Sequence, residues 1–128
     1  MALILVIDDN DLVRTLIRNI LVTEGHKVVE APNGKIALRL FRENVPDLVL
    51  TDIFMPEKEG IETIREVKKQ RPELPIIAIS GGASNMDSSF TLGWAQRAGA
   101  DRVIAKPFAN AALMSAVNDL LVNHEAKV

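Results

Sequence analysis

Short apolar runs rich in valine and isoleucine alternate along the chain with segments whose apolar residues follow a helical spacing. Continuous apolar runs of this kind are typical of strands that are buried on both faces of a parallel sheet. Five strands are predicted, at residues 3–7, 27–30, 48–51, 76–79 and 103–105. The run Lys27–Glu30 is short and partly polar, which predicts a strand at the edge of the sheet.

The helical spacing is clearest after the first strand, where apolar residues stand at positions i, i+3, i+4, i+7 and i+8, namely Val13, Leu16, Ile17, Ile20 and Leu21. Gly25 stands at the expected C-terminal cap. Further apolar stripes predict four more helices, at residues 37–41, 61–67, 87–98 and 113–121. Right-handed crossovers between parallel strands place such helices on both faces of the sheet. We therefore expect a doubly wound α/β fold with a five-stranded parallel sheet. It should form a single domain over residues 1–128, with no room for an effector domain.

The composition limits the kind of protein that this domain can be. Hydrophobic residues make up 48% of the 128 residues, which favours a folded chain. A net charge of −2 argues against a nucleic-acid surface, and the lack of cysteine excludes disulfides and thiolate metal sites. The first residues predict no signal peptide, and none of the apolar stretches has the length of a membrane span. We expect a cytoplasmic protein that binds neither nucleic acid nor membrane.

Polar residues stand where four of the predicted strands end. They are Asp8 and Asp9, Asp52, Ser80, and Lys106, which Pro107 follows. In an open parallel sheet these ends lie at one edge, and ligands bind at that edge. The sequence therefore predicts that three carboxylates, one hydroxyl and one ammonium group meet in a single cleft.

The three carboxylates indicate a metal site. Carboxylates that share a cleft repel each other, and a divalent cation relieves the repulsion. Ligands that are all oxygens favour Mg²⁺ over zinc, and a Mg²⁺ ion held in this way can also take a phosphoryl oxygen. The alternative is that the run Asp8–Asp11 only caps the first helix and that Asp52 is a turn residue. Taken singly, Lys106 can also be a surface side chain and Ser80 a turn residue.

Six features of the sequence, taken together, resemble the receiver domain of two-component response regulators over nearly the whole chain. They are Leu-Val-Ile-Asp-Asp-Asn at 5–10, Asp-Ile-Phe-Met-Pro at 52–56, Gly60, Ser80, Gly-Ala-Asp at 99–101 and Lys-Pro-Phe at 106–108. The resemblance implies a flavodoxin-like sheet with strand order 2-1-3-4-5. The turn that begins Ser80-Gly81-Gly82 is similar to that of a subgroup of stand-alone receivers.

The resemblance also implies a role for each residue at the predicted edge. Asp52 would accept a phosphoryl group from a sensor histidine kinase. Asp9 would bind Mg²⁺ directly, Asp8 directly or through water, and Phe54 through its backbone carbonyl. Ser80 would be the switch hydroxyl, and Lys106 would pair with a phosphoryl oxygen ahead of a cis bond to Pro107.

The implied function is a switch that binds an output protein when it is phosphorylated. Such a protein is a phosphoacceptor that assists its own phosphorylation and dephosphorylation rather than an enzyme. The alternative is a phosphorelay shuttle that passes the phosphoryl group to a histidine phosphotransfer protein. An aspartyl phosphatase would need an aspartate where Phe54 stands. Receivers usually have an aromatic residue where this chain has Val103, so we expect the response in the loop Gly81–Asp87 and the helix that carries Trp94.

Overall fold

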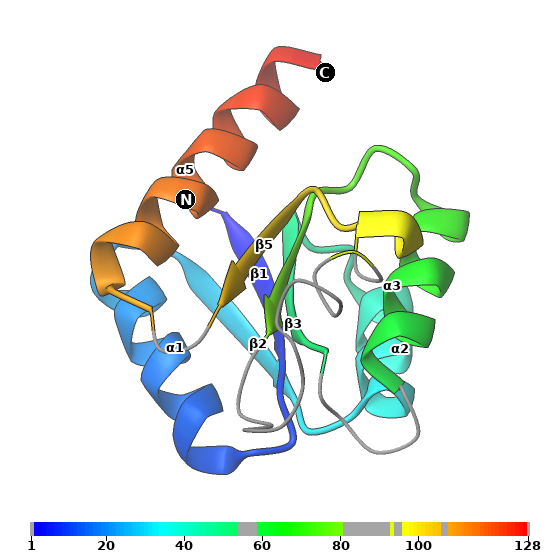
Figure 1. Ribbon diagram of the computed structural model, residues 1–128, viewed down its shortest axis with the longest axis horizontal. Coiled ribbons are helices and arrows are strands. Elements are labelled where there is room, and N and C mark those ends of the chain that lie inside the picture. The colour runs from blue at the N-terminus through cyan, green and yellow to red at the C-terminus, as the bar shows by residue number, and fades with distance from the viewer. Residues whose placement is uncertain (1, 54–58, 81–92, 94–95, 106–107, 128) are drawn as a thin grey trace.

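A computed structural model describes residues 2–53, 59–80, 93, 96–105 and 108–127 (Figure 1). Strands and helices alternate as the sequence predicts, and they build a doubly wound α/β fold. The elements are β1 (Leu3–Ile7), α1 (Asp11–Thr23), β2 (Lys27–Ala31), α2 (Gly34–Glu43), β3 (Leu48–Asp52), α3 (Glu59–Gln70), β4 (Ile76–Ser80), β5 (Arg102–Ala105) and α5 (Asn110–Lys127). The helix predicted at 87–98 falls mostly outside the described residues, although Gln96–Ala98 are helical.

The five strands are parallel, in the order β2-β1-β3-β4-β5. This order confirms the fold that the resemblance implies and the edge position predicted for β2. The central strand, β3, is buried along its whole length. Its carboxyl end, at Asp52, therefore lies in the middle of the sheet edge.

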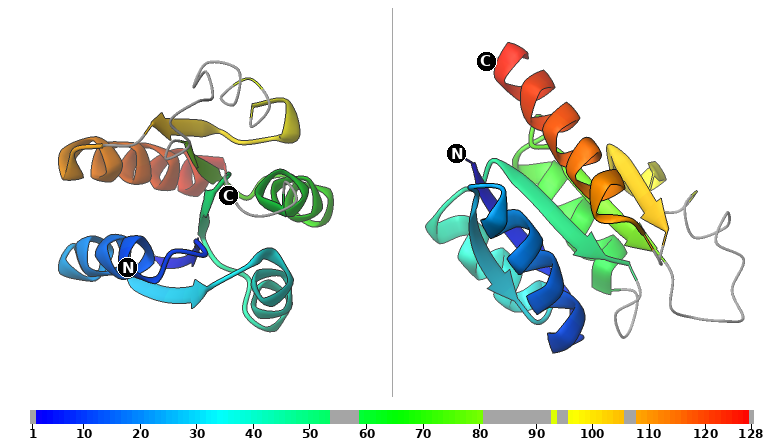
Figure 2. Two further views of the ribbon diagram at one scale, coloured as in Figure 1. Left: turned by 60° about the horizontal axis from the view of Figure 1, so that its bottom comes forward. Right: turned by 90° about the vertical axis from the view of Figure 1, so that its left-hand side faces the viewer.

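Two apolar clusters cover the two faces of the sheet. Along β1, Leu5 and Ile7 belong to the cluster on the α2 and α3 side, whereas Ile4 and Val6 belong to the cluster on the α1 and α5 side. Figure 2 shows the sheet between these two pairs of helices. Both faces are apolar because successive side chains of a strand point to opposite faces and both faces pack against helices.

Capping residues fix the ends of the helices that flank β2. The Asn33 side chain accepts a hydrogen bond from the Ile36 amide at 2.9 Å and caps the start of α2. Gly25 follows the end of α1 with a φ of +90°, a conformation that suits glycine and confirms the predicted cap.

The last helix is longer than its apolar stripe. The stripe predicts helix up to Leu121, but α5 continues to Lys127. The segment after Leu121 contains neither proline nor glycine, and it includes good helix formers such as Glu125 and Ala126. Helical propensity therefore extends α5 beyond the apolar stripe. None of the helices in the described ranges is long and apolar enough to cross a membrane.

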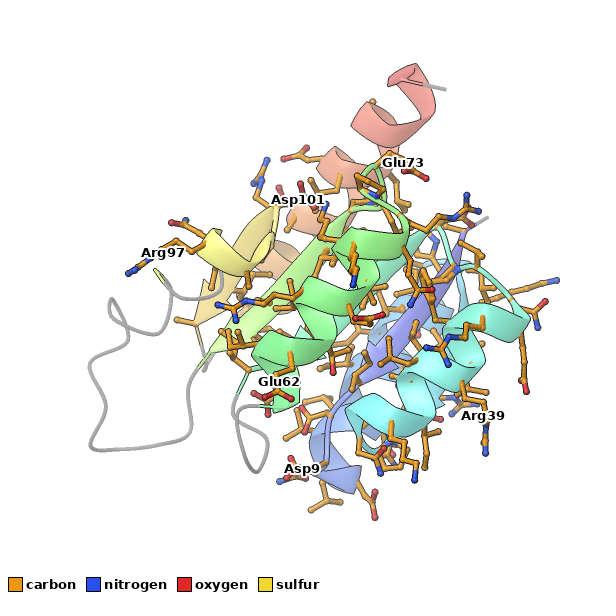
Figure 3. All side chains as sticks on the ribbon, turned by 90° about the vertical axis from the view of Figure 1, so that its right-hand side faces the viewer. Asp9, Arg39, Glu62, Glu73, Arg97 and Asp101 are labelled. Atoms are coloured by element: carbon orange, nitrogen blue, oxygen red, sulfur yellow. The ribbon has the colours of Figure 1, made fainter. Side chains whose placement is uncertain are left out.

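The Gly-Ala-Asp motif is at the opposite end of the sheet from Asp9 (Figure 3). The Asp101 carboxylate accepts hydrogen bonds from the Ile76 amide at 2.8 Å and from the Lys68 ammonium at 2.9 Å. Gly99 has a φ of +123°, and an added Cβ would come within 2.7 Å of the Lys68 side chain. The motif thus joins the end of α3 to the start of β4, which is a structural role away from the predicted cleft.

Candidate functional site

The register of the sheet brings the acidic residues together. Ile7 of β1 pairs with Thr51 of β3, so Asp8 and Asp52 come next at the same level of the two neighbouring strands. Asp8 is 1% exposed and Asp52 is 4% exposed, whereas Asp9 is exposed on the loop that follows β1. One carboxylate oxygen from each of the three residues lies within 4.8 Å of the others. The structure therefore assembles the three carboxylates that the sequence predicts at this edge.

In the loop between β1 and α1, the residue that caps the helix differs from the residues of the acidic cluster. The Asn10 side chain accepts hydrogen bonds from the amides of Leu12 at 3.0 Å and Val13 at 3.1 Å, so Asn10 is the cap of α1. One oxygen of the Asp8 carboxylate accepts a hydrogen bond from the Asn10 amide at 2.8 Å. The capping alternative is thus correct for Asn10, while Asp8 and Asp9 belong to the cluster.

The donor set fits a hard divalent cation. Three carboxylates, two of them buried, concentrate negative charge where solvent screens it poorly. All of the ligand atoms are oxygens, and few carboxylates with room for further ligands are typical of Mg²⁺ sites. Asp8, Asp9 and Asp52 would therefore hold Mg²⁺.

Gly60 allows α3 to begin directly against the end of β3. A Cβ at this position would clash with the carbonyl oxygen of Asp52 and would lie 2.8 Å from the Cα of Ile53. Both of these atoms belong to the backbone and cannot move aside cheaply. The absence of a side chain at Gly60 thus sets how closely α3 approaches the acidic cluster.

We expect Gly60→Ala to lower the free energy of unfolding by about 1–3 kcal/mol, because the added methyl group forces the backbone at Asp52 to shift. Urea denaturation measures this loss. Gly93→Ala is the matched control, since the contact that its new Cβ would make among the described residues is with the flexible Arg97 side chain at 3.5 Å. Equal stability of the two variants would contradict this account of Gly60.

Several residues with predicted roles are outside the described part of the chain. Ser80 ends β4, where its backbone pairs with Ala105, but its side chain is not described. Phe54, Lys106, Pro107, the loop 81–87 and Trp94 also lie outside the described residues. Val103 is partly buried and packs against the apolar cluster on the α3 side. The roles of these residues stay predictions.

Arg14 is a neighbour of the site that the sequence pattern does not reveal. Its guanidinium donates a hydrogen bond to the backbone carbonyl of Asp8 at 2.8 Å. Burial by itself lowers the pKa of Arg14, but hydrogen bonds and ion pairs with Asp11 and Glu30 outweigh it and raise the pKa above its ordinary value. The one feature of the sequence that could indicate a contact between Arg14 and this loop is the position of Arg14, one helical turn after Asn10.

Comparison with known proteins agrees with the fold and the acidic cluster. Residues 4–118 match the family described as response regulator receiver domain. The chain belongs to this family, whose members are the signalling switches of two-component systems and take phosphoryl groups from histidine kinases.

The relatives of the chain include proteins of its own size. It is 39% identical to the chemotaxis protein CheY of Bacillus subtilis over 119 residues, which are 92% of this chain and 96% of that protein. A receiver domain protein from Clostridium thermocellum is 30% identical, with a TM-score of 0.90 and full coverage of both chains. The structure of NtrX from Brucella abortus is 35% identical, with a TM-score of 0.89. In that match 98% of this chain corresponds to 28% of the NtrX chain.

Proposed function

We propose that Asp52 is the residue that accepts the phosphoryl group and that Asp8 and Asp9 hold the Mg²⁺ ion that assists the transfer. The observation that carries this proposal is the grouping of the three carboxylates within 4.8 Å at the end of the central strand. Asp52 is the member of the group on β3 itself, whereas Asp9 lies on a loop and Asp8 is tied to the Asn10 amide. Asp52 is thus the carboxylate that stands on the central strand, at the middle of the sheet edge.

Two hydrogen bonds hold the backbone at Asp52. The Thr51 hydroxyl donates to the Asp52 carbonyl oxygen at 3.1 Å, and the Ile53 amide donates to the Ile79 carbonyl at 3.0 Å. A fixed backbone lets the carboxylate meet the incoming phosphorus in one direction. Such positioning is a major part of phosphoryl-transfer catalysis.

The transfer exchanges one bond to phosphorus for another. An oxygen of the Asp52 carboxylate attacks the phosphorus of a phosphohistidine, the P–O bond forms and the P–N bond breaks. The histidine nitrogen leaves and takes up a proton, and Asp52 becomes an acyl phosphate that water later hydrolyses. A bound Mg²⁺ ion supplies positive charge that stabilises the phosphoryl oxygens during this exchange.

Intact-protein mass spectrometry with acetyl phosphate as the donor tests the proposal. In the presence of Mg²⁺ the protein should gain the mass of one phosphoryl group. Removing Mg²⁺ with a chelator should reduce this gain sharply. A protein that gains no mass, or gains it equally without Mg²⁺, would contradict the proposed function.

The phosphorylated protein would act by binding an output protein, and a sensor histidine kinase would be its donor. The similarity to a chemotaxis protein of the same length supports a switch that works through such binding. The relay alternative, the cytoplasmic location and the lack of an effector domain stay predictions.

A further inference from the structure

We infer that Arg14 is a positioning residue for the metal site: its guanidinium holds the loop that carries Asp8 and Asp9 in the arrangement that binds Mg²⁺. The inference rests on the proposed function, because it assumes that the three carboxylates form a Mg²⁺ site. Arg14 itself belongs to α1 and contacts Asp8 through the backbone carbonyl, not the carboxylate.

Each nitrogen of the guanidinium donates to a different segment of the fold. Nη1 donates to the carbonyl oxygen of Asp8 at 2.8 Å, directly after β1. Nη2 donates to the carboxylate of Asp11 at 2.6 Å, in the first turn of α1. Nε donates to the carboxylate of Glu30 at 3.2 Å, in β2. One side chain therefore ties the acidic loop to the strand and the helix beside it.

The environment of Arg14 suits this task. The side chain is 14% exposed, so solvent competes weakly for its partly buried hydrogen bonds to Asp8 and Glu30. The planar guanidinium offers donors in fixed directions, and a lysine ammonium cannot reproduce three such contacts at once. The partners Asp11 and Glu30 compensate the charge of the partly buried cation.

The hydrogen bond from Arg14 to the Asp8 carbonyl affects the direction in which the backbone continues to Asp9. The Asp8 carbonyl belongs to the peptide group that links the two residues, so fixing this oxygen fixes the plane from which Asp9 continues. Asp9 is exposed, and the orientation of its carboxylate therefore depends on the backbone. Arg14 also pairs with Asp11, the first residue of α1, so this ion pair compensates the charge of a third acid near the cluster.

If Arg14 acted on the site only through its positive charge, its removal would strengthen Mg²⁺ binding instead of weakening it. Loss of a positive charge near a cation site strengthens cation binding by Coulomb interaction. Loss of a positioning contact weakens it, and outer contacts of metal ligands typically account for 10–100-fold in affinity. The sign of the change in Mg²⁺ affinity therefore separates the two explanations.

Calorimetric titration of the unphosphorylated protein with Mg²⁺ tests the inference. Arg14→Ala should weaken binding by about tenfold or more. The matched control is Arg18→Ala, because Arg18 lies one turn along α1 and contacts Glu30 at 3.5 Å in the same ion-pair cluster. This control should bind Mg²⁺ as tightly as the wild type or slightly more tightly.

Arg14→Lys is the second variant, in case Arg14→Ala does not fold. It keeps the charge but places all of its donors on one nitrogen, so its Mg²⁺ affinity should be lower than that of the wild type and no lower than that of Arg14→Ala. Unchanged or tighter binding in every Arg14 variant that folds would overturn the inference and leave the proposed function intact. Equal weakening in Arg18→Ala would also overturn it, because that control lacks the contact with Asp8. A wild-type protein that does not bind Mg²⁺ would overturn the inference and the proposed function together.

Discussion

Asp52→Asn is expected to lose the phosphoryl group that the wild type gains from acetyl phosphate and Mg²⁺, by a factor of more than about a hundred. The asparagine amide has nearly the same shape as the carboxylate, but its oxygen carries no negative charge and is a poor nucleophile. Intact-protein mass spectrometry after a fixed incubation measures the difference directly.

The matched control is Asp47→Asn, which makes the same change just before the amino end of β3. Asp47 is exposed, and its carboxylate accepts a hydrogen bond from the Leu3 amide at 2.8 Å. This variant should gain the phosphoryl group as the wild type does. If Asp52→Asn is labelled to the same extent as Asp47→Asn, the assignment of Asp52 is wrong.

Asp9→Ala is expected to weaken Mg²⁺ binding by about tenfold or more, since it removes a proposed direct ligand from the cluster. Asp9 is exposed, so its removal leaves the packing of the core unchanged. Asp8 is 1% exposed and is a poorer choice, because its replacement would also disturb the interior. Calorimetric titration measures the loss in affinity.

The same variant should lose part of the stability that the metal gives. Mg²⁺ at a hundredfold excess over its dissociation constant adds about 2.7 kcal/mol to the free energy of unfolding of the wild type. A tenfold weaker site at the same Mg²⁺ concentration adds about 1.4 kcal/mol less. Glu62→Ala, which removes an exposed carboxylate of α3 outside the cluster, is the control (Figure 3). If Asp9→Ala and Glu62→Ala gain equal stability from Mg²⁺, Asp9 is not a ligand.

The fold could be predicted from the sequence because its strands are buried on both faces. Runs such as Leu3–Ile7 and Leu48–Thr51 are apolar at successive positions, and alternation with helical segments makes a parallel sheet covered on both sides the expected setting for such a pattern. The same argument places their carboxyl ends, and with them Asp8 and Asp52, at one edge. The strand order itself needed the resemblance to a family, since apolar runs do not reveal their neighbours.

The contacts of Arg14 could not be predicted in this way. Glu30 lies 16 residues further along the chain, and the two residues meet only because β2 pairs with β1. The extent of α5 was also missed, because the apolar stripe marks the residues that pack on the sheet and not the end of the hydrogen-bonded helix. A local apolar pattern indicates neither which distant residues a side chain contacts nor where a helix ends.

Chemical mapping of the phosphorylated residue tests the central claim most directly. Borohydride reduces an aspartyl phosphate to homoserine, and peptide mass spectrometry then locates the homoserine in the chain. After treatment with acetyl phosphate and Mg²⁺, the account predicts homoserine at position 52. Homoserine at position 8 or 9 in place of position 52 would contradict it.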